Sequence, residues 1–440
     1  MSKMMKPLTN WYGDTTMKLF EHQKQILNLL TSNNSFAVFA EQGTGKTYPV
    51  LYHLYNLFMA KEIENALVIC PASVKGSWNR DIEKLGKRKA KYLKNLVVVS
   101  YDMVWRRKEY ERAWDCIVLD ESHSIAHRNT KRTKFIHKLK NMSKYRYIMT
   151  GTPMHNGHYE DYYSQIDFIL PNYLGTYNEF LAHHTVQRQL PGTYVKIIVK
   201  YRNVQELLDK ISEKAYYIDK ESCLDLPDKL PDNIIDCELK EKKKYKEALE
   251  NFIEEFDMNI GNPMSVIVKL RQLCSGFVID DYQELHELKC EKIKMLDELI
   301  DSLNGKLVIF AEFTYSLSQI HKLLEKKKIN YVTLDGKQRN KSIWKDFQEN
   351  EDIQVIVCQY RSANAGIDLF ASSNMIFYEP NQSSTVIDQA MARIHRNGQT
   401  SKCSYHWLIT KDTVEEDIYE RVSNGIDFNV EALDNFRQRM

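Results

Sequence analysis

A glycine-rich turn that ends in lysine and threonine is the stretch of this sequence best suited to chemistry. The turn, Ala40-Glu41-Gln42-Gly43-Thr44-Gly45-Lys46-Thr47, follows the apolar run 35–40 and opens a helical pattern over 48–60. Backbone N–H groups of such a turn point at an anion, the lysine brings positive charge to the β- and γ-phosphates of a nucleotide, and the threonine hydroxyl can ligate magnesium. An ordinary strand-turn-helix connection looks similar by itself. The residues that follow favour a phosphate-binding loop, in which the nucleotide is held by Gly43, Thr44, Gly45, Lys46 and Thr47.

An acidic pair follows another apolar run in the same half of the chain. Asp120 and Glu121 come directly after the run 116–119. Hydrolysis of a nucleoside triphosphate needs one carboxylate to hold magnesium, usually through water, and a second to orient the attacking water. Acidic pairs at strand ends also serve as turn or cap residues. With a phosphate-binding loop upstream, we assign the magnesium ion to Asp120 and the attacking water to Glu121.

A glutamine upstream of the loop could read the base of the nucleotide. Gln23 lies in the stretch 19–30, whose apolar spacing predicts an amphipathic helix start. A side-chain amide can pair with both the donor and the acceptor edge of adenine. A solvent-facing helix glutamine is the alternative interpretation, and Gln23 taken alone does not decide between them.

Two arginines near the end of the chain supply positive charge. Arg393 and Arg396 lie in the stretch 388–399, three residues apart, so on a helix they share one face. A solvated basic helix is the simpler interpretation, but it does not account for the way this stretch ends, His-Arg-Asn-Gly-Gln. Projected from one lobe into a triphosphate site on the other, both arginines would stabilise charge on the transferring phosphoryl group.

The elements that must position these residues are short apolar strands separated by helices. In the first half we predict strands at 35–40, 66–70, 96–100, 116–119 and 145–149. This alternation predicts a doubly wound parallel sheet whose ligand crevice lies beyond the carboxyl ends of the strands. The polar turn 150–156 follows the last of them, and its hydroxyl groups could sense the nucleotide.

The second half repeats the pattern without a phosphate-binding loop. Its predicted strands are 306–310, 331–334, 353–358, 375–378 and 405–409, and its predicted helices are 317–327, 343–347 and 387–393. Between the halves, 160–236 is more helical and polar and contains a basic, aromatic stretch at 194–202. The prolines of 226–231 restrict the backbone and mark a linker. We therefore predict an α/β fold with two lobes, 1–226 and 227–440.

Composition limits the kinds of function. The 440 residues include 61 Lys and Arg against 59 Asp and Glu, a formal charge of +2, so any nucleic-acid site must be a local basic groove. The 8 cysteines form no C-x-x-C pair, which argues against zinc ribbons and a disulfide framework. No signal peptide is visible, and no apolar run approaches the roughly 18 residues of a membrane span. We expect a cytoplasmic protein that binds no membrane.

Together the motifs resemble those of superfamily 2 helicase-type motors, and more narrowly the Swi/Snf family of double-stranded DNA translocases. The most specific match is Gln-x-x-x-Arg-x-His-Arg-x-Gly-Gln at 389–399, a family hallmark. In family order, the matching segments are 19–23, 41–47, 71–78, 120–123, 150–156, 362–369 and 389–399, with further family-like segments at 270–276 and 413–416. The family also lacks the leading glycine of the phosphate-binding loop, so Ala40 fits it.

The resemblance implies an ATP-dependent motor that moves along double-stranded DNA. It implies two RecA-like lobes with ATP and magnesium between them, and nucleotide contacts from Gly366 and Gln389. Duplex DNA would lie across both lobes, bound mostly through its phosphates by Lys75, Trp78 and the turn near Arg361. A strand-separating helicase and an inactive ATP-responsive DNA-binding scaffold stay open as alternatives.

The sequence departs from the family in three places. The turn usually written Gly-Gly-Leu-Gly-x-Asn-Leu reads Ala-Asn-Ala-Gly-Ile-Asp-Leu at 363–369, which places Asp368 where the family has asparagine. The connection 335–347 is shorter than is typical, and no chromatin-reading module is visible beyond the two lobes. These features fit a reduced motor of prokaryotic or viral origin, acting in the host cytoplasm if viral.

Overall fold

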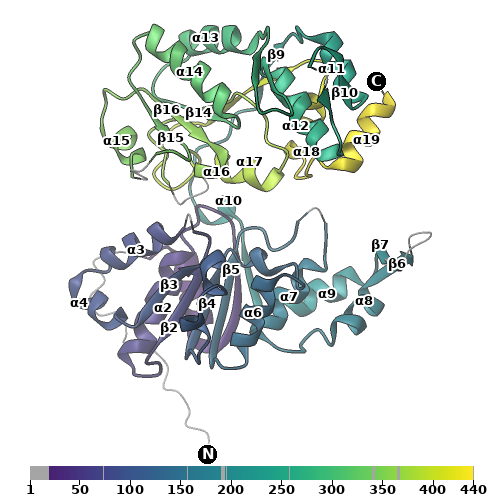
Figure 1. The fold of residues 1–440 in the computed structure, drawn as a ribbon. Helices are drawn as coiled ribbons and strands as arrows, with labels where there is room; N and C mark the ends of the chain where they lie inside the picture. The colour runs from purple at the N-terminus through teal and green to yellow at the C-terminus, as the bar shows by residue number, and fades with distance from the viewer. Residues whose placement is uncertain are drawn as a thin grey trace, which may run out of the picture.

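A computed structural model of the protein describes residues 19–439, except 73, 156, 190–193, 195, 257, 339–341 and 364–366. The chain folds into two α/β lobes, each built on a six-stranded parallel sheet (Figure 1). This confirms the predicted fold class. None of the described helices is long and apolar enough to cross a membrane.

The first sheet has the strand order β3-β2-β4-β5-β1-β8, with all neighbours parallel. Its strands are β1 (Ser35–Ala40), β2 (Ala66–Cys70), β3 (Leu96–Ser100), β4 (Cys116–Asp120), β5 (Tyr145–Thr150) and β8 (Ala215–Ile218). Because β4, β5 and β1 are neighbours, their carboxyl ends lie side by side. The residues that follow these three strands are thereby brought together.

Helices cover both faces of the first sheet because successive strand residues point to opposite sides. In β1, Phe36 and Val38 pack with α1 to α3, whereas Ala37 and Phe39 pack with α5 to α9. The helices of this lobe are α1 (Glu21–Ser32), α2 (Thr47–Met59), α3 (Lys75–Lys84), α4 (Lys87–Ala90), α5 (Tyr101–Val104), α6 (Lys131–Lys140), α7 (Asp161–Ile169), α8 (Tyr177–His184) and α9 (Val204–Ser212). Short 3-10 helices are η1 (Lys91–Leu93), η2 (Lys108–Tyr110) and η3 (Ser122–Ile125).

The second sheet has the order β15-β16-β14-β17-β18-β9 and is also parallel throughout. Its strands are β9 (Asn233–Cys237), β14 (Leu307–Ala311), β15 (Tyr331–Leu334), β16 (Val355–Gln359), β17 (Asn374–Phe377) and β18 (Ser404–Thr410). One face of β14 packs against α13 and α14, and the other against α11, α12 and α15 to α19. The same alternation therefore builds both cores.

The remaining elements of the second lobe surround this sheet. Its helices are α11 (Lys242–Leu249), α12 (Pro263–Cys274), α13 (Lys292–Ser302), α14 (Thr314–Lys326), α15 (Trp344–Glu349), α16 (Tyr360–Ala363), α17 (Ser384–Met391), α18 (Val414–Ser423) and α19 (Val430–Arg439). Two small hairpins pair β10 (Phe252–Ile253) with β11 (Met258–Asn259) and β12 (Phe277–Ile279) with β13 (Leu285–Glu287), and η4 spans Glu254–Phe256.

The segment between the two sheets is short. Helix α10 (Lys220–Cys223) follows β8, and β9 opens the second sheet, so the chain changes lobe between Ile218 and Asn233. The predicted linker at 226–231 lies within this interval. The exact boundary at 226 stays a prediction.

All ten predicted strands exist, with ends shifted by at most two residues, but eight strands, β6 to β13, were missed. Strands β8 and β9 are the edges of the two sheets. Strands β6 (Thr185–Gln189) and β7 (Lys196–Tyr201) form an antiparallel hairpin that projects from the first lobe (Figure 1). The predicted helix at 387–393 is also shifted, since α17 ends at Met391.

Candidate nucleotide site between the lobes

The turn between β1 and α2 has the backbone expected of a phosphate-binding loop. Gly43 and Gly45 have φ angles of 91° and 74°, a region that favours glycine. Thr44 is buried, and its hydroxyl donates to the Glu41 carbonyl at 2.8 Å. The turn therefore has a fixed shape in which the start of α2 faces the space beyond the sheet.

Lys46 and Glu121 are paired across this site. The lysine Nζ lies 3.2 Å from Glu121 Oε1, and both side chains are buried. The Thr150 hydroxyl donates to Glu121 Oε2 at 3.0 Å and also contacts His123 Nδ1 at 2.9 Å. Although burial opposes it, the nearby Lys46 and His123 lower the pKa of the Glu121 carboxyl. The glutamate is thus held as an anion.

The backbone of Glu121 is strained. Its φ and ψ of 54° and 57° lie in the left-handed region, which non-glycine residues seldom adopt. Such outliers cost of order 1 to 3 kcal/mol and cluster at functional sites, where the surroundings hold them in place. Here the strained residue is the one that meets both Lys46 and Thr150.

Asp120 is held from behind by Trp78. The indole Nε1 donates to Asp120 Oδ2 at 2.8 Å, and the Trp78 side chain is fully buried. Burial and the adjacent Glu121 raise the pKa of Asp120 to about 7, against the opposing effects of Lys46 and of the Trp78 hydrogen bond. The prediction that Trp78 contacts DNA is wrong, because the ring packs in the core of the first lobe.

Gln23 braces the phosphate-binding loop. Its Nε2 donates to the Gly45 carbonyl at 3.2 Å, and its Oε1 accepts from the Phe20 N–H at 3.1 Å. A Cβ at Gly45 would lie 2.7 Å from this Nε2, so only glycine leaves room for the amide. Gln23 is buried, so a solvent-facing glutamine is excluded. Pairing of its amide with adenine stays a prediction.

Arg393 and Arg396 approach the site from the second lobe, but not from one helix face. Both lie in the turn that follows α17, which corrects the predicted helical spacing. Arg396 forms an ion pair with Asp368 at 2.7 Å and donates to the Ile367 carbonyl at 2.8 Å. Arg393 is buried, and this burial together with Arg396 lowers its pKa to about 10.

A cavity of about 740 Å³ between the lobes collects these side chains. Its volume lies within the usual range for small-molecule sites. Every predicted site residue that the structure describes lines it, namely Gln23, Gly43, Thr44, Gly45, Lys46, Thr47, Asp120, Glu121, Gln389, Arg393 and Arg396. Gly366 lies outside the described residues.

The sequence analysis did not assign three further residues near this cavity. Phe20 lines it with a 43% exposed side chain, three residues before Gln23, and offers an aromatic face to a flat base. Asp368, which also lines it, was visible only as a departure from the family pattern. Lys220 joins the lobes, since its backbone N–H donates to Glu41 and its Nζ to the His395 carbonyl. Nothing in the sequence around Lys220 indicated this contact.

The donors at the cavity fit magnesium. The hydroxyl of Thr47 and the carboxylate of Asp120 both line it, and magnesium prefers oxygen ligands. One Asp120 oxygen accepts the indole N–H, which fixes the orientation of the carboxylate. Both predicted magnesium residues therefore have the right chemistry for that ion.

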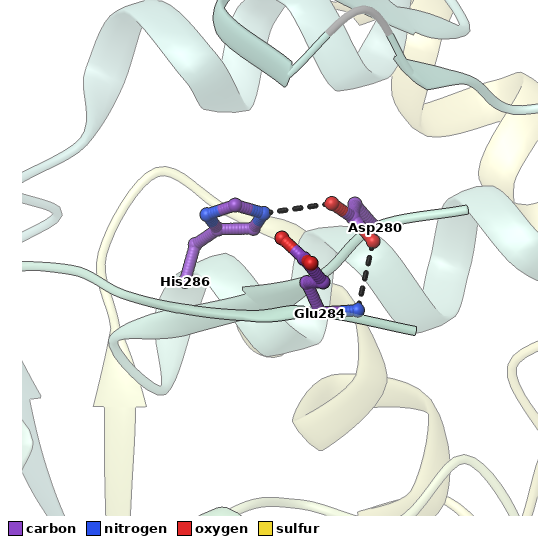
Figure 2. A group of neighbouring side chains, drawn as sticks. All are labelled: Asp280, Glu284 and His286. Carbon is purple, nitrogen blue, oxygen red and sulfur yellow. Dashed lines mark hydrogen bonds and ion pairs between the residues drawn. The ribbon is translucent and has the colours of Figure 1, made fainter. Parts of the chain in front are cut away.

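The described residues contain one further group with metal-ligating atoms, Asp280, Glu284 and His286 in the β12–β13 hairpin (Figure 2). Asp280 Oδ1 accepts the N–H groups of Tyr282 and Glu284, both at 2.9 Å, and Oδ2 lies 2.9 Å from His286 Nε2. These bonds close the hairpin turn. We interpret the group as a structural clamp.

Known proteins are similar to this chain in sequence. The chain is 26% identical over 411 residues to an uncharacterised ATP-dependent helicase of Mycoplasma genitalium, covering 86% of this chain and 38% of the relative. It is 25% identical over 415 residues to a putative ATP-dependent helicase/translocase of Bacillus subtilis (86% and 44% covered) and 24% identical over 465 residues to an ISWI chromatin-remodelling complex ATPase of Saccharomyces cerevisiae (93% and 40%). The chain spans less than half the length of these curated relatives.

A solved structure and two family models also match. The Sulfolobus solfataricus SWI2/SNF2 ATPase core in complex with double-stranded DNA is 24% identical, with a TM-score of 0.44 over 93% of this chain and 91% of that one. The helicase conserved C-terminal domain matches residues 291–398. The SNF2-related domain matches residues 22–277, more than half of the chain. The protein therefore belongs to the SNF2-related family.

Proposed function

We propose that this protein hydrolyses ATP and uses the reaction to move along double-stranded DNA. The observation that carries the proposal is the cavity itself, which Lys46, Asp120 and Glu121 line from one lobe and Arg393 and Arg396 from the other. A nucleotide bound there would contact both lobes at once. Binding would then favour closure of the cleft, and hydrolysis would reopen it.

The roles of the residues follow from their positions. The loop from Gly43 to Thr47 would cradle the phosphates, and Lys46 would exchange its contact with Glu121 for the β- and γ-phosphates. Glu121, released from the lysine and still bonded to Thr150, would orient the attacking water. Magnesium, when bound, would neutralise developing charge on the phosphates. Thr47 and Asp120 would hold it.

The arginines would act on the transferring phosphoryl group. Arg396 has a partly exposed guanidinium on the cavity wall, and Arg393, which is more buried, lines the same cavity. Their charges would stabilise the transition state more than the bound substrate, which is the condition for an effect on turnover. Gln389 lines the same wall and would contact the nucleotide there.

Double-stranded DNA is the partner that we propose. The names of two relatives contain helicase or translocase and that of a third chromatin remodelling, but these names describe longer proteins. Exposed Lys75 on α3 and exposed Arg361 on α16 offer phosphate contacts on the two lobes. Phosphate contacts carry little sequence information, so binding should depend on salt more than on base sequence.

An ATPase assay with no DNA, single strands and long duplex tests this proposal. We expect duplex to stimulate turnover most, and an annealed triplex-forming strand to be displaced only with ATP. Glu121→Gln should bind ATP and lose hydrolysis by orders of magnitude, whereas Lys46→Ala should also lose binding. Unwinding of a forked duplex, or stimulation by single strands alone, would favour a strand-separating helicase. If the wild type bound ATP but did not hydrolyse it, the protein would be an ATP-responsive DNA-binding scaffold and not a motor.

A further inference from the structure

The β6–β7 hairpin is a separate surface of the first lobe. Its two strands pair only with each other, and they extend beyond α8 and α9 on the side of the lobe opposite α3 and α4 (Figure 1). None of its described residues lines the nucleotide cavity. The hairpin therefore needs a role other than completing the sheet or the site.

The charge of this segment is entirely of one sign. Residues 185–202 contain Arg188, Lys196, Lys200 and Arg202 and neither aspartate nor glutamate, although the whole chain has 59 acidic residues against 61 basic ones. All four basic residues are exposed. Such a cluster creates a local positive field on a protein that is nearly neutral overall.

The register of the hairpin places two of these charges on one face. Lys200 lies opposite Val186, and Arg188 lies two residues further along β6, so Lys200 and Arg188 point to the same side. Because the register shifts between Val186 and Gln187, Lys196, which lies opposite Gln189, points to the other side. Residues placed diagonally across two paired strands lie about 7 to 8 Å apart. Two neighbouring cations match a line of phosphates better than an apolar partner.

The base of the hairpin is fastened to the lobe. Arg202 Nε and Asn203 Nδ2 both donate to the His183 carbonyl, at 3.1 and 2.9 Å. The Tyr201 ring packs against Tyr159 with centroids 5.2 Å apart. A force on the hairpin would therefore be transmitted to the lobe, as a motor that holds its track requires.

We infer that the face carrying Arg188 and Lys200 binds the sugar-phosphate backbone of duplex DNA, at a distance from the nucleotide cavity. This inference rests on the proposed function, because it presumes that duplex DNA is the track. It adds a second contact that would keep the first lobe on the DNA while the cleft opens.

The test compares a double variant, Arg188→Gln with Lys200→Gln, against the wild type. The matched control is Lys294→Gln with Lys322→Gln, which removes two exposed lysines from α13 and α14 of the other lobe. Dissociation constants for a 40-base-pair duplex are measured over a series of salt concentrations, with circular dichroism to check folding. ATP turnover without DNA should be equal in all three proteins.

We expect the hairpin variant to bind about tenfold more weakly at low salt, and the slope of log affinity against log salt to fall by about 1.8, since each phosphate contact contributes about 0.9. The control should keep the wild-type slope. An unchanged slope in the hairpin variant overturns the inference while leaving a DNA-stimulated wild type as proposed. If the hairpin variant lost binding to poly-glutamate and kept its binding to duplex, the face would bind an acidic protein. A wild type that binds no duplex would overturn both proposals.

Discussion

Arg396 is held on its own lobe by Asp368. The two side chains lie 2.7 Å apart, and the same guanidinium group donates to the Ile367 carbonyl at 2.8 Å. Both residues line the nucleotide cavity, so the ion pair lies where the triphosphate would bind. An arginine that acts on the phosphoryl group must leave this pair or share it with the nucleotide.

Asp368→Asn should therefore speed the reaction. The change releases Arg396 and removes a negative charge from a cavity that also contains Asp81, Asp120 and Glu121. Repulsion between one carboxylate and the phosphates of ATP at this site costs about 1 kcal/mol of binding free energy. Without it, KM for ATP should fall about fivefold, with kcat unchanged or higher. Arg396→Ala is the comparison, and it should slow turnover by about 10³-fold or more. Steady-state ATPase kinetics show whether Asp368 restrains Arg396 or positions it for the reaction. A fall in kcat/KM for Asp368→Asn would mean that the aspartate positions the arginine.

The Trp78 hydrogen bond should tune the response to magnesium. Trp78→Phe keeps an aromatic ring but leaves a buried oxygen of Asp120 without its donor, a loss of about 1 to 3 kcal/mol. The magnesium concentration for half-maximal turnover should rise about tenfold, while nucleotide binding without magnesium stays unchanged. Trp114→Phe is the control, because Trp114 is equally buried but donates to the Tyr110 carbonyl. Equal magnesium curves for both variants would count against the assignment of Asp120.

The central strands could be predicted because they are buried on both faces. Strand β2 is apolar throughout and β4 is apolar up to Asp120, and parallel strands in a doubly wound sheet favour this composition. The site followed from the same fact, since β1, β4 and β5 are neighbours whose carboxyl ends meet. The turn 43–47 and the acidic pair therefore meet at the edge of the sheet where the sequence predicts a ligand crevice.

The remaining elements depend on contacts that no local pattern shows. Strands β8 and β9 lie at sheet edges, where β8 is only four residues long and partly exposed, and the apolar run of β9 is bounded by Asn233 and interrupted by Asp236. Trp78 stands in a stretch with several basic residues, and only the fold shows that its ring turns inward to Asp120. Arg393 and Arg396 have a spacing that fits a helix, but α17 ends at Met391, two residues before Arg393.

A buried ion pair should hold the second lobe together. Lys292 Nζ lies 2.6 Å from Glu415 Oε1, both side chains are fully buried, and the ammonium group also donates to the Tyr378 carbonyl. Lys292→Met leaves an unpaired charge and should reduce the free energy of unfolding by about 3 to 5 kcal/mol. The double change with Glu415→Leu should recover part of this loss, although the Thr410 N–H then loses its acceptor. Urea denaturation of the four proteins in a double-mutant cycle measures the coupling, and a double variant less stable than Lys292→Met would contradict it.

A buried histidine should make the first lobe sensitive to acid. His53 on α2 has its Nε2 2.9 Å from the Tyr147 hydroxyl, and burial lowers the pKa of the imidazole to about 3. The unfolded chain takes up this proton below about pH 6.5, whereas the folded chain does not until about pH 3. Stability should therefore be lost as the pH falls between these values, by up to about 1.4 kcal/mol per pH unit.

The variant His53→Gln isolates this effect, because an amide can still bond to Tyr147 but takes up no proton in this range. Between pH 7.0 and 4.5 the wild type should lose about 2.5 kcal/mol more of its free energy of unfolding than the variant does. His127→Gln serves as the control, since His127 is exposed. Urea denaturation midpoints at pH 7.0, 5.5 and 4.5 give the three pH dependences. If His53→Gln lost stability with acid as steeply as the wild type, the buried imidazole would not be the group responsible.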